Sequence, residues 1–275
     1  MIRLGLIGFP VSHSMSPRIQ NAALKACGLE GEYSLFTVPP DDKQGLRNLL
    51  DRVRSGEIQG LNVTIPHKQN VIEFMDELTP TAKVIGAVNV IYMRDNKLVG
   101  DNTDASGFFS DLNGFIGNHE SKIVNPKSAV VLGAGGSARA VVYALANDGW
   151  EVTIAARRLE QARQLASSFT NYHLQTTTFD LYPSTFNLIV NATPVGMTPN
   201  VERSPLPENL SLPQNVIIYD LVYSPRETKL VKDARSQGLH ATTGLGMLIE
   251  QAALGFKLWT GHTPPRDILY NSVVE

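Results

Sequence analysis

Residues 128–139 read SAVVLGAGGSAR and decide how this chain is expected to fold. A short apolar run leads into a glycine-rich turn, and helical spacing follows from Ser137 to Asp148. In a G-x-G-x-x-A turn, Gly133 permits the tight bend and Gly135 lets the backbone approach a pyrophosphate, while Ala138 allows the helix to pack close to the strand. The N–H groups at the start of such a helix attract an anion, so the stretch predicts a Rossmann-type dinucleotide-binding unit. The alternative is a glycine-rich turn that binds nothing.

Strand and helix patterns alternate on both sides of this turn, which predicts parallel sheets. Ser16 is expected to cap the first helix, with Pro17 at its first position. The polar segment 117–127 separates two runs of elements, so the 275 residues are expected to form two α/β domains. The expected strands are 2–8, 33–38, 60–65, 128–133, 151–155, 187–191 and 216–220, and the expected helices are 17–26, 43–55, 137–148, 159–169 and 247–259.

Composition excludes several classes of protein. The 24 Lys and Arg nearly balance the 26 Asp and Glu, so no basic field for nucleic acid or an acidic membrane is expected. The longest uncharged stretch, 181–201, is interrupted by prolines, and the N-terminus lacks a secretory signal, so we expect no membrane association and a cytoplasmic protein. The single cysteine, Cys27, excludes an intramolecular disulfide and is expected in the core.

The end of the second nucleotide-unit strand indicates which dinucleotide is bound. NAD-binding units carry an acidic residue about 20 positions past the first glycine. Residues 155–158 here read AARR, and two guanidinium groups suit a 2′-phosphate, which favours NADP over NAD. Glu160 falls inside the next expected helix. The alternative is that Arg157 and Arg158 are solvated charges at a strand end.

Small polar groups concentrate beside the strands of the first unit, at 14–16, 62–68, 87–89 and 102–104. Asn62 and Thr64 would share one face of a strand and point into the crevice at its carboxyl end. Such a lining suits a small polyhydroxylated acid, because each buried hydroxyl needs a hydrogen-bond partner.

Six motifs, in order along the chain, resemble the shikimate dehydrogenase family. They are S-x-S-P at 14–17, N-V-T-x-P-H-K at 62–68, G-A-V-N at 86–89, N-T-D at 102–104, G-A-G-G-S-A-R at 133–139 and G-L-G-M-L-x-x-Q at 244–251. The resemblance covers nearly the whole chain. It implies NADP-dependent, reversible reduction of 3-dehydroshikimate to shikimate in the chorismate pathway of aromatic amino-acid biosynthesis.

The resemblance also implies domains and residue roles. The parallel-sheet substrate domain would comprise 1–104 plus 247–275, with the last helix returning to it, and the Rossmann-type NADP domain 105–246. Lys68 and Asp104 would be the catalytic pair, and no metal is expected. The substrate residues would be Ser14, Ser16, Asn62, Thr64, Lys68, Asn89, Asp104, Tyr223 and Gln251. The cofactor residues would be Gly133, Ala134, Gly135, Gly136, Ser137, Ala138, Arg157, Arg158, Asn191, Thr193, Leu221, Gly244 and Met247.

One departure from the family concerns the cofactor loop. The family's N-R-T-x-x-R appears here as ARRLEQ at 156–161, so phosphate recognition should depend on Arg157 and Arg158. Quinate/shikimate dehydrogenases tend to carry an aspartate after such an Arg-Arg pair, where Leu159 stands here, which weakens an NAD-using interpretation.

Several alternatives stay open from the sequence. Taken singly, Lys68 could be a surface lysine and Asp104 a turn residue or helix N-cap. His67 and His13 are better explained as structural residues than as metal ligands, because no second histidine lies at a helical spacing. Two competing functions remain: a dehydrogenase that acts on quinate or an aminated analogue, and a non-catalytic module that binds NADP or shikimate. The oligomeric state is open, with a homodimer among the alternatives.

Overall fold

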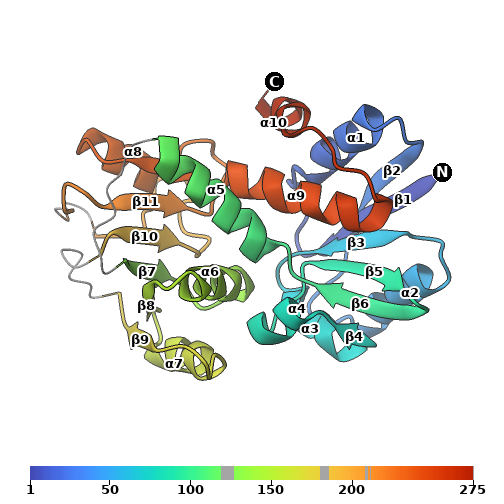
Figure 1. The fold of residues 1–275 in the computed structure, drawn as a ribbon, viewed down its shortest axis with the longest axis horizontal. Coiled ribbons are helices and arrows are strands. Elements are labelled where there is room, and N and C mark those ends of the chain that lie inside the picture. The colour runs from blue at the N-terminus through green and yellow to red at the C-terminus, as the bar shows by residue number, and fades with distance from the viewer. Residues whose placement is uncertain (119–126, 180–185, 208–209, 211, 275) are drawn as a thin grey trace. The chain divides into compact units, whose positions relative to one another are not determined.

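The computed structural model describes residues 1–118, 127–179, 186–207, 210 and 212–274, and it contains two compact units (Figure 1). Unit 1 comprises Met1–Gly107 and Ile249–Glu275, and unit 2 comprises Phe108–Leu248. The divisions fall inside two helices, α5 (Asp104–Asn118) and α9 (Leu245–Thr260). The boundary expected at 117–127 lies mostly outside the described residues.

Unit 1 contains a six-stranded sheet in the order β2-β1-β3-β5-β6-β4. β1 pairs in parallel with β2 and with β3, as the alternating pattern predicted. The sheet is mixed, however, because β5 runs antiparallel to both β3 and β6. Asp95 and Asn96 join β5 to β6 with positive φ angles of 51° and 60°, the conformation of a two-residue hairpin. The strands are β1 (Ile2–Gly8), β2 (Gly31–Thr37), β3 (Gly60–Val63), β4 (Glu77–Leu78), β5 (Val90–Arg94) and β6 (Lys97–Asp101).

The two N-terminal helices of unit 1 begin and end close to the predicted residues, with one corrected cap, whereas the helical turns between 67 and 85 and the helix 266–274 were not predicted. Ser16 is the first residue of α1, and Met15 occupies the cap position without a side-chain hydrogen bond. Ser14 Oγ instead accepts from the Ser16 backbone N–H at 3.2 Å. Besides the part of α9 from Ile249, these helices are α1 (Ser16–Ala26), α2 (Lys43–Arg54), α3 (His67–Asn70), the 3-10 helix η1 (Val71–Phe74), α4 (Pro80–Ile85) and α10 (Arg266–Val274).

Unit 2 contains a second six-stranded sheet, in which every strand pair is parallel. Its order, β12-β11-β10-β7-β8-β9, is the doubly wound order of Rossmann folds, and it reverses between β7 and β10. Ligands of such sheets bind at the carboxyl ends of the strands beside that reversal. The strands are β7 (Ser128–Leu132), β8 (Glu151–Ala155), β9 (Leu174–Thr177), β10 (Leu188–Asn191), β11 (Ile217–Asp220) and β12 (Ala241–Thr243), and further helices are α6 (Gly136–Asn147), α7 (Leu159–Ser167) and α8 (Lys229–Ser236).

The core of unit 2 lies between its sheet and helix α8. Val130, Leu132 and Ile189 of the second sheet are fully buried with Leu230 and Val231 of α8. Cys27 lies at the C-cap of α1 as a free, half-buried thiol, so it is less deeply buried than a core position. Within the described ranges, no helix has the length and apolar character needed to cross a bilayer.

Candidate functional site

The central feature of unit 1 is a buried ion pair between Lys68 and Asp104. Lys68 Nζ donates to Asp104 Oδ2 at 2.5 Å, and the two residues are 8% and 4% exposed. Lys68 is therefore not a surface lysine. Asp104 is the first residue of α5 rather than its N-cap, and Asn102 Oδ1 accepts the Ala105 backbone N–H at 3.3 Å. The carboxylate of Asp104 is consequently free of capping and engages the ammonium group instead.

Asn89 orients the second oxygen of that carboxylate. Its Nδ2 donates to Asp104 Oδ1 at 2.8 Å, and its Oδ1 accepts the backbone N–H of Thr103 at 2.7 Å. Because a backbone N–H can only donate, this contact determines which end of the Asn89 amide faces Asp104. Both oxygens of Asp104 are thus held from different elements of the chain.

The last long helix brings Gln251 to the same place. Gln251 Oε1 lies 3.4 Å from Asn89 Nδ2, and Thr103 Oγ1 donates to the Gln251 backbone carbonyl at 3.2 Å. Gly107 of α5 allows this approach, since a Cβ at that position would lie 2.8 Å from the Gln251 backbone nitrogen. Gln251 therefore contacts Asn89 within unit 1, although the two residues are 162 positions apart in the chain.

Asn62 is linked to this network through β3. Its Nδ2 donates to the Asn89 backbone carbonyl at 3.1 Å, and its Oδ1 accepts from the Tyr33 hydroxyl at 2.7 Å. Sequence reasoning placed Tyr33 in a strand and missed this contact. β3 ends at Val63, so Thr64 lies one residue beyond the strand, where its backbone N–H still donates to Ile7 O at 2.9 Å.

Ser14 and Ser16 lie at the start of α1. One helical turn after Ser16, Gln20 Nε2 donates to the backbone carbonyl of Ala252 at 3.1 Å. Ser16 and Gln20 share a helix face, so this bond packs the face that carries Ser16 against α9 next to Gln251.

The two histidines that the sequence singled out differ in environment. His13 is exposed, whereas His67 is buried with its Nε2 2.7 Å from the backbone carbonyl of Val38. No cluster of three or more His, Cys, Asp or Glu side chains in the described part of the chain could hold a metal ion. The contact with Val38 agrees with a structural role for His67.

In unit 2, the glycine-rich turn has the shape that a pyrophosphate needs. Gly133 adopts a φ of 119°, and a Cβ there would lie 3.0 Å from the carbonyl oxygen of Ala192. Gly135 occupies the N-cap of α6 without a side-chain cap, and no heavy atom lies within 4 Å of where its Cβ would be. The space beside Gly135 is therefore open at the start of α6, where the positive end of the helix dipole suits a bound anion.

Arg157 and Arg158 are exposed just beyond the end of β8. Arg158 occupies the N-cap position of α7 without a side-chain cap. Glu160 lies inside that helix, as expected, with its carboxylate 3.8 Å from Arg163 Nη1. Both guanidinium groups thus lie where the sequence placed them, at the carboxyl end of the second strand of the nucleotide unit.

Comparisons with known proteins match the sequence of both units. Family models match residues 6–91 (shikimate dehydrogenase substrate binding domain), 117–232 (shikimate / quinate 5-dehydrogenase) and 244–273 (shikimate 5'-dehydrogenase C-terminal domain). The curated shikimate dehydrogenase (NADP(+)) of Methanocaldococcus jannaschii is 38% identical, with 99% of this chain and 96% of the relative covered. The chain belongs to the shikimate dehydrogenase family.

Solved structures of this family also share the fold. A crystal structure of a shikimate dehydrogenase in complex with NADP+ matches with a TM-score of 0.92 and 38% identity, covering 100% of this chain and 95% of that one. Shikimate 5-dehydrogenase of Thermus thermophilus, solved with NADP(H) and shikimate, has a TM-score of 0.86 and 37% identity, with 99% and 98% covered. The resemblance and the two-domain α/β fold class predicted from the sequence are confirmed.

The cofactor residues that the family implied at the end of β10 adjoin a buried acidic group. Asn191 Nδ2 donates to Asp220 Oδ1 at 2.8 Å, and Thr193 Oγ1 donates to Asn191 Oδ1 at 2.7 Å. Thr228 Oγ1 donates to Asp220 Oδ2 at 2.7 Å. Burial raises the pKa of the Asp220 carboxyl to about 6, against the opposing effect of these hydrogen bonds. Asp220 was not among the residues predicted from the sequence, because a pattern of residue types does not show complete burial.

Other residues implied by the shikimate dehydrogenase family also lie in unit 2. Gly244 contacts Leu221 closely, since a Cβ on Gly244 would lie 2.9 Å from Leu221 Cα. Met247 is buried in the first turns of α9. Tyr223 is half-buried, and burial raises the pKa of its phenol. The ligand contacts of these residues stay predictions.

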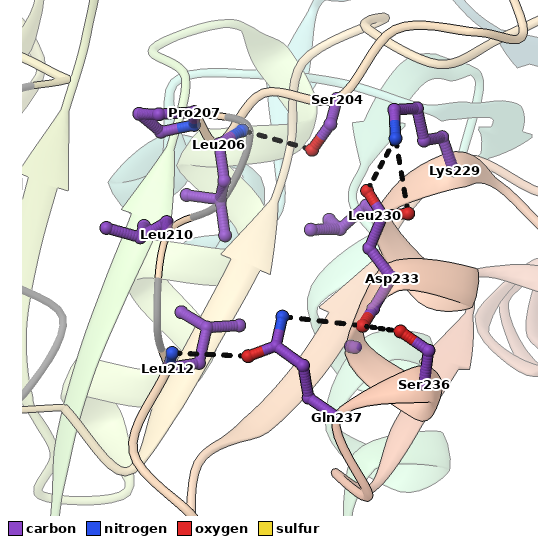
Figure 2. Close-up of a pocket in the computed structure, with 11 residues that line it drawn as sticks. Ser204, Leu206, Pro207, Leu210, Leu212, Lys229, Leu230, Asp233, Ser236 and Gln237 are labelled. Atoms are coloured by element: carbon purple, nitrogen blue, oxygen red, sulfur yellow. Dashed lines mark hydrogen bonds and ion pairs between the residues drawn. The ribbon is translucent and has the colours of Figure 1, made fainter.

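A cavity of about 370 Å³ lies elsewhere in unit 2, between the segment around Leu206 and helix α8 (Figure 2). Lys229 and Asp233 form an ion pair of 2.9 Å on its helical side. None of the residues implied by the shikimate dehydrogenase family lines this cavity. Its lining is Ser204, Leu206, Pro207, Leu210, Leu212, Lys229, Leu230, Asp233, Ala234, Ser236 and Gln237.

Proposed function

We propose that this protein catalyses the reversible, NADP-dependent reduction of 3-dehydroshikimate to shikimate in the chorismate pathway of aromatic amino-acid biosynthesis. The observation that carries the proposal is the buried Lys68–Asp104 pair, in which Asn89 holds Asp104 and is itself in contact with Gln251. The expectation of an NADP-dependent oxidoreductase of this family is confirmed by curated relatives that bear that name, including one matched over 99% of this chain.

Lys68 is proposed to move the proton. Reduction of a ketone places negative charge on its oxygen, and an ammonium group within hydrogen-bond distance can donate to that oxygen as the charge develops. In the reverse direction, the neutral amine accepts the proton of the shikimate hydroxyl. Burial of Lys68 excludes most water from this exchange, which strengthens the electrostatic effect of the ammonium group.

Asp104 is proposed to hold Lys68 and to contact the same hydroxyl of the substrate. Its Oδ2 accepts from Lys68, while Asn89 keeps Oδ1 in place. A carboxylate with both oxygens held has little rotational freedom, so the ammonium group is aimed before substrate arrives. Asp104 then compensates the charge of Lys68 in a site that is largely closed to solvent.

The polar side chains of unit 1 are proposed to bind shikimate. Ser14 and Ser16 supply hydroxyl groups suited to the carboxylate, and Asn62, Thr64, Asn89 and Gln251 supply donors and acceptors for the ring hydroxyls. The connected amides of Asn62, Asn89 and Gln251 support this assignment, because their hydrogen bonds determine where each donor lies. An analogue that lacks a matching hydroxyl would leave one of these groups unpaired, which costs about 1–3 kcal/mol.

NADPH, when bound, supplies the hydride for the carbonyl carbon. The chain's own contribution is to hold it: the open turn at Gly135 and the uncapped start of α6 suit the pyrophosphate, and Arg157 with Arg158 suits the 2′-phosphate. Substrate and cofactor are small diffusible molecules, and the free Cys27 needs no oxidising compartment. We therefore place the reaction in the cytoplasm.

Absorbance of the reduced nicotinamide tests the proposal, with shikimate or quinate paired with NADP+ or NAD+ in four assays. We expect shikimate with NADP+ to give the highest kcat/KM of the four pairs. A higher kcat/KM with quinate would contradict the substrate, and a higher value with NAD+ would contradict the cofactor. Turnover with none of the pairs would favour a binding module without catalysis.

A further inference from the structure

Lys68 lies on a structural element that has little stability of its own. α3 contains four residues, His67–Asn70, and one turn of helix is marginal without tertiary contacts. Besides the helical bond from Val71 N–H to His67 O, two backbone hydrogen bonds from the described residues hold this turn: His67 N–H donates to Thr64 O at 2.9 Å, and Val88 N–H donates to Lys68 O at 2.7 Å. The position of Lys68 relative to Asp104 therefore depends on what anchors α3.

The side chain of His67 supplies a third anchor. Its Nε2 lies 2.7 Å from the backbone carbonyl of Val38, and since a carbonyl oxygen only accepts, Nε2 carries the hydrogen. Val38 follows β2, and its own N–H donates to Gly8 O at 3.1 Å at the end of β1. The His67 ring thus connects the turn that carries Lys68 to the ends of two strands of the sheet.

The second ring nitrogen shows that this anchor comes at an energetic cost. His67 is 1% exposed, and Nδ1 is buried without a hydrogen-bond partner among the described residues. A buried polar atom without a hydrogen-bond partner loses its hydration with nothing in return, a loss that an apolar side chain of similar size would avoid. The histidine is consequently better explained by the hydrogen bond that Nε2 makes than by filling space.

We propose that His67 is a positioning residue that holds Lys68 in place against Asp104 through its hydrogen bond to the Val38 carbonyl. The inference rests on the proposed function, in which Lys68 moves the proton. A shift of about 1 Å in a catalytic group can lower a rate roughly a hundredfold, so loss of the anchor should reduce turnover while the substrate-binding groups stay in place. A shuttle role for His67 itself is disfavoured, because its ring is buried and its Nε2 bonds a backbone carbonyl.

Two substitutions separate the hydrogen bond from the volume of the ring. His67→Met keeps an apolar side chain of similar length and removes the donor, whereas the amide nitrogen of His67→Gln can occupy the place of Nε2. For H67M we expect kcat to fall about tenfold to a hundredfold, with KM for shikimate and NADP+ within about threefold of wild type. For H67Q we expect kcat within about threefold of wild type, because the bond to Val38 is restored. His262→Met, at an exposed histidine of unit 1, is the matched control and should leave both parameters unchanged.

The outcomes distinguish this inference from the proposed function. Wild-type protein that fails to oxidise shikimate with NADP+ contradicts the proposed function. An active wild type with unimpaired H67M, or with H67Q impaired as strongly as H67M, contradicts the positioning role. If H67M does not fold, as judged by its thermal unfolding, His67→Asn replaces it, because its shorter amide does not reach the Val38 carbonyl. A wild-type kcat in H67N also contradicts the positioning role.

Discussion

Gly107 lies directly against the backbone of Gln251. A Cβ at 107 would come within 2.8 Å of Gln251 N and 2.9 Å of Gln251 Cβ. The contact brings α9 close enough for Gln251 Oε1 to approach Asn89, and Thr103 Oγ1 bonds the Gln251 carbonyl at 3.2 Å. The absence of a side chain at one position of α5 thus determines the place of a candidate substrate residue on another helix.

Gly107→Ala should therefore weaken the site, whereas the same change at Gly114 should not. A methyl group at 107 meets backbone atoms that cannot rotate away, so we expect a loss of about 1–3 kcal/mol of unfolding free energy and a higher KM for shikimate. Gly114 is exposed in the same helix, and a Cβ added there would have no heavy atom within 4 Å. Because alanine is the better helix former, G114A should gain about 0.5–1 kcal/mol in chemical denaturation. Equal effects of the two changes would contradict the contact.

Lys68→Ala should reduce turnover far more than substrate binding. Loss of a positioned general acid and base lowers kcat by about a hundredfold to ten-thousandfold, whereas hydrogen bonds from the other polar groups still hold shikimate. Steady-state kinetics combined with calorimetric measurement of shikimate binding separates the two effects. Lys43→Ala, which removes an exposed lysine paired with Glu73, is the control. Near-wild-type turnover in K68A would refute the catalytic assignment.

Replacing both Arg157 and Arg158 by alanine should change cofactor preference. Charge-assisted hydrogen bonds to a 2′-phosphate contribute about 1.5–3 kcal/mol, so KM for NADP+ should rise about tenfold to a hundredfold. KM for NAD+, which lacks this phosphate, should stay within about threefold. Arg163→Ala serves as the control, because Arg163 is exposed in α7 and pairs with Glu160. An equal rise for both cofactors would show that the arginines do not recognise the 2′-phosphate.

Tyr33→Phe should affect binding of substrate through Asn62. The change removes the hydroxyl that donates to Asn62 Oδ1 at 2.7 Å and keeps the ring. We expect KM for shikimate to rise about threefold to tenfold, since a buried polar group that loses its partner costs about 1–3 kcal/mol, part of which appears in folding. The kcat should stay close to wild type, and the exposed Tyr270→Phe should change neither parameter. A fall in kcat alone would contradict a role through Asn62.

Asp220 should make unit 2 less stable as pH rises. Its pKa is about 6 in the folded chain against an ordinary value of 3.8, so between these values the folded state binds more protons than the unfolded state. The unfolding free energy therefore decreases with rising pH, by about 1–2 kcal/mol between about pH 5 and pH 7.5. Asp220→Asn should abolish this decrease. Fluorescence of Trp150 in a Trp259→Phe background reports unfolding of unit 2, and an unchanged pH dependence in D220N would contradict the prediction.

Much of the fold could be predicted because local patterns specify it. The glycine-rich turn, the helix after it and the order of strand and helix patterns depend on neighbouring residues, and all were found as expected in unit 2. The hairpin of β5 and β6 was missed, although Asp95 and Asn96 form a two-residue turn. Residues that favour such a turn also occur in other loops, so the turn alone does not predict the hairpin. The antiparallel pairing of β5 with β3 depends on the packing of the whole sheet.

For the candidate site too, the residues could be predicted from the sequence but their contacts could not. Lys68, Asn89, Asp104 and Gln251 were identified from motifs, but their mutual hydrogen bonds depend on the packing of α5 and α9. The roles of Tyr33, His67 and Asp220 depend on burial and on the hydrogen-bond partners that each side chain meets in the fold. Nothing in the residue type of a tyrosine, histidine or aspartate indicates which carbonyl or amide it will meet.

By itself, the sequence determined the family, the doubly wound nucleotide unit and the residue types available for chemistry, because these depend on motifs and on local periodicity. Only the tertiary structure decided that Lys68 is buried against Asp104, that Asn89 holds the second carboxylate oxygen, and that Gln251 joins them across most of the chain's length. The physical reason is that hydrogen bonds and burial act over a few ångströms in space. The separation of two residues along the chain does not indicate their distance in space, which is set only when the helices and sheets pack.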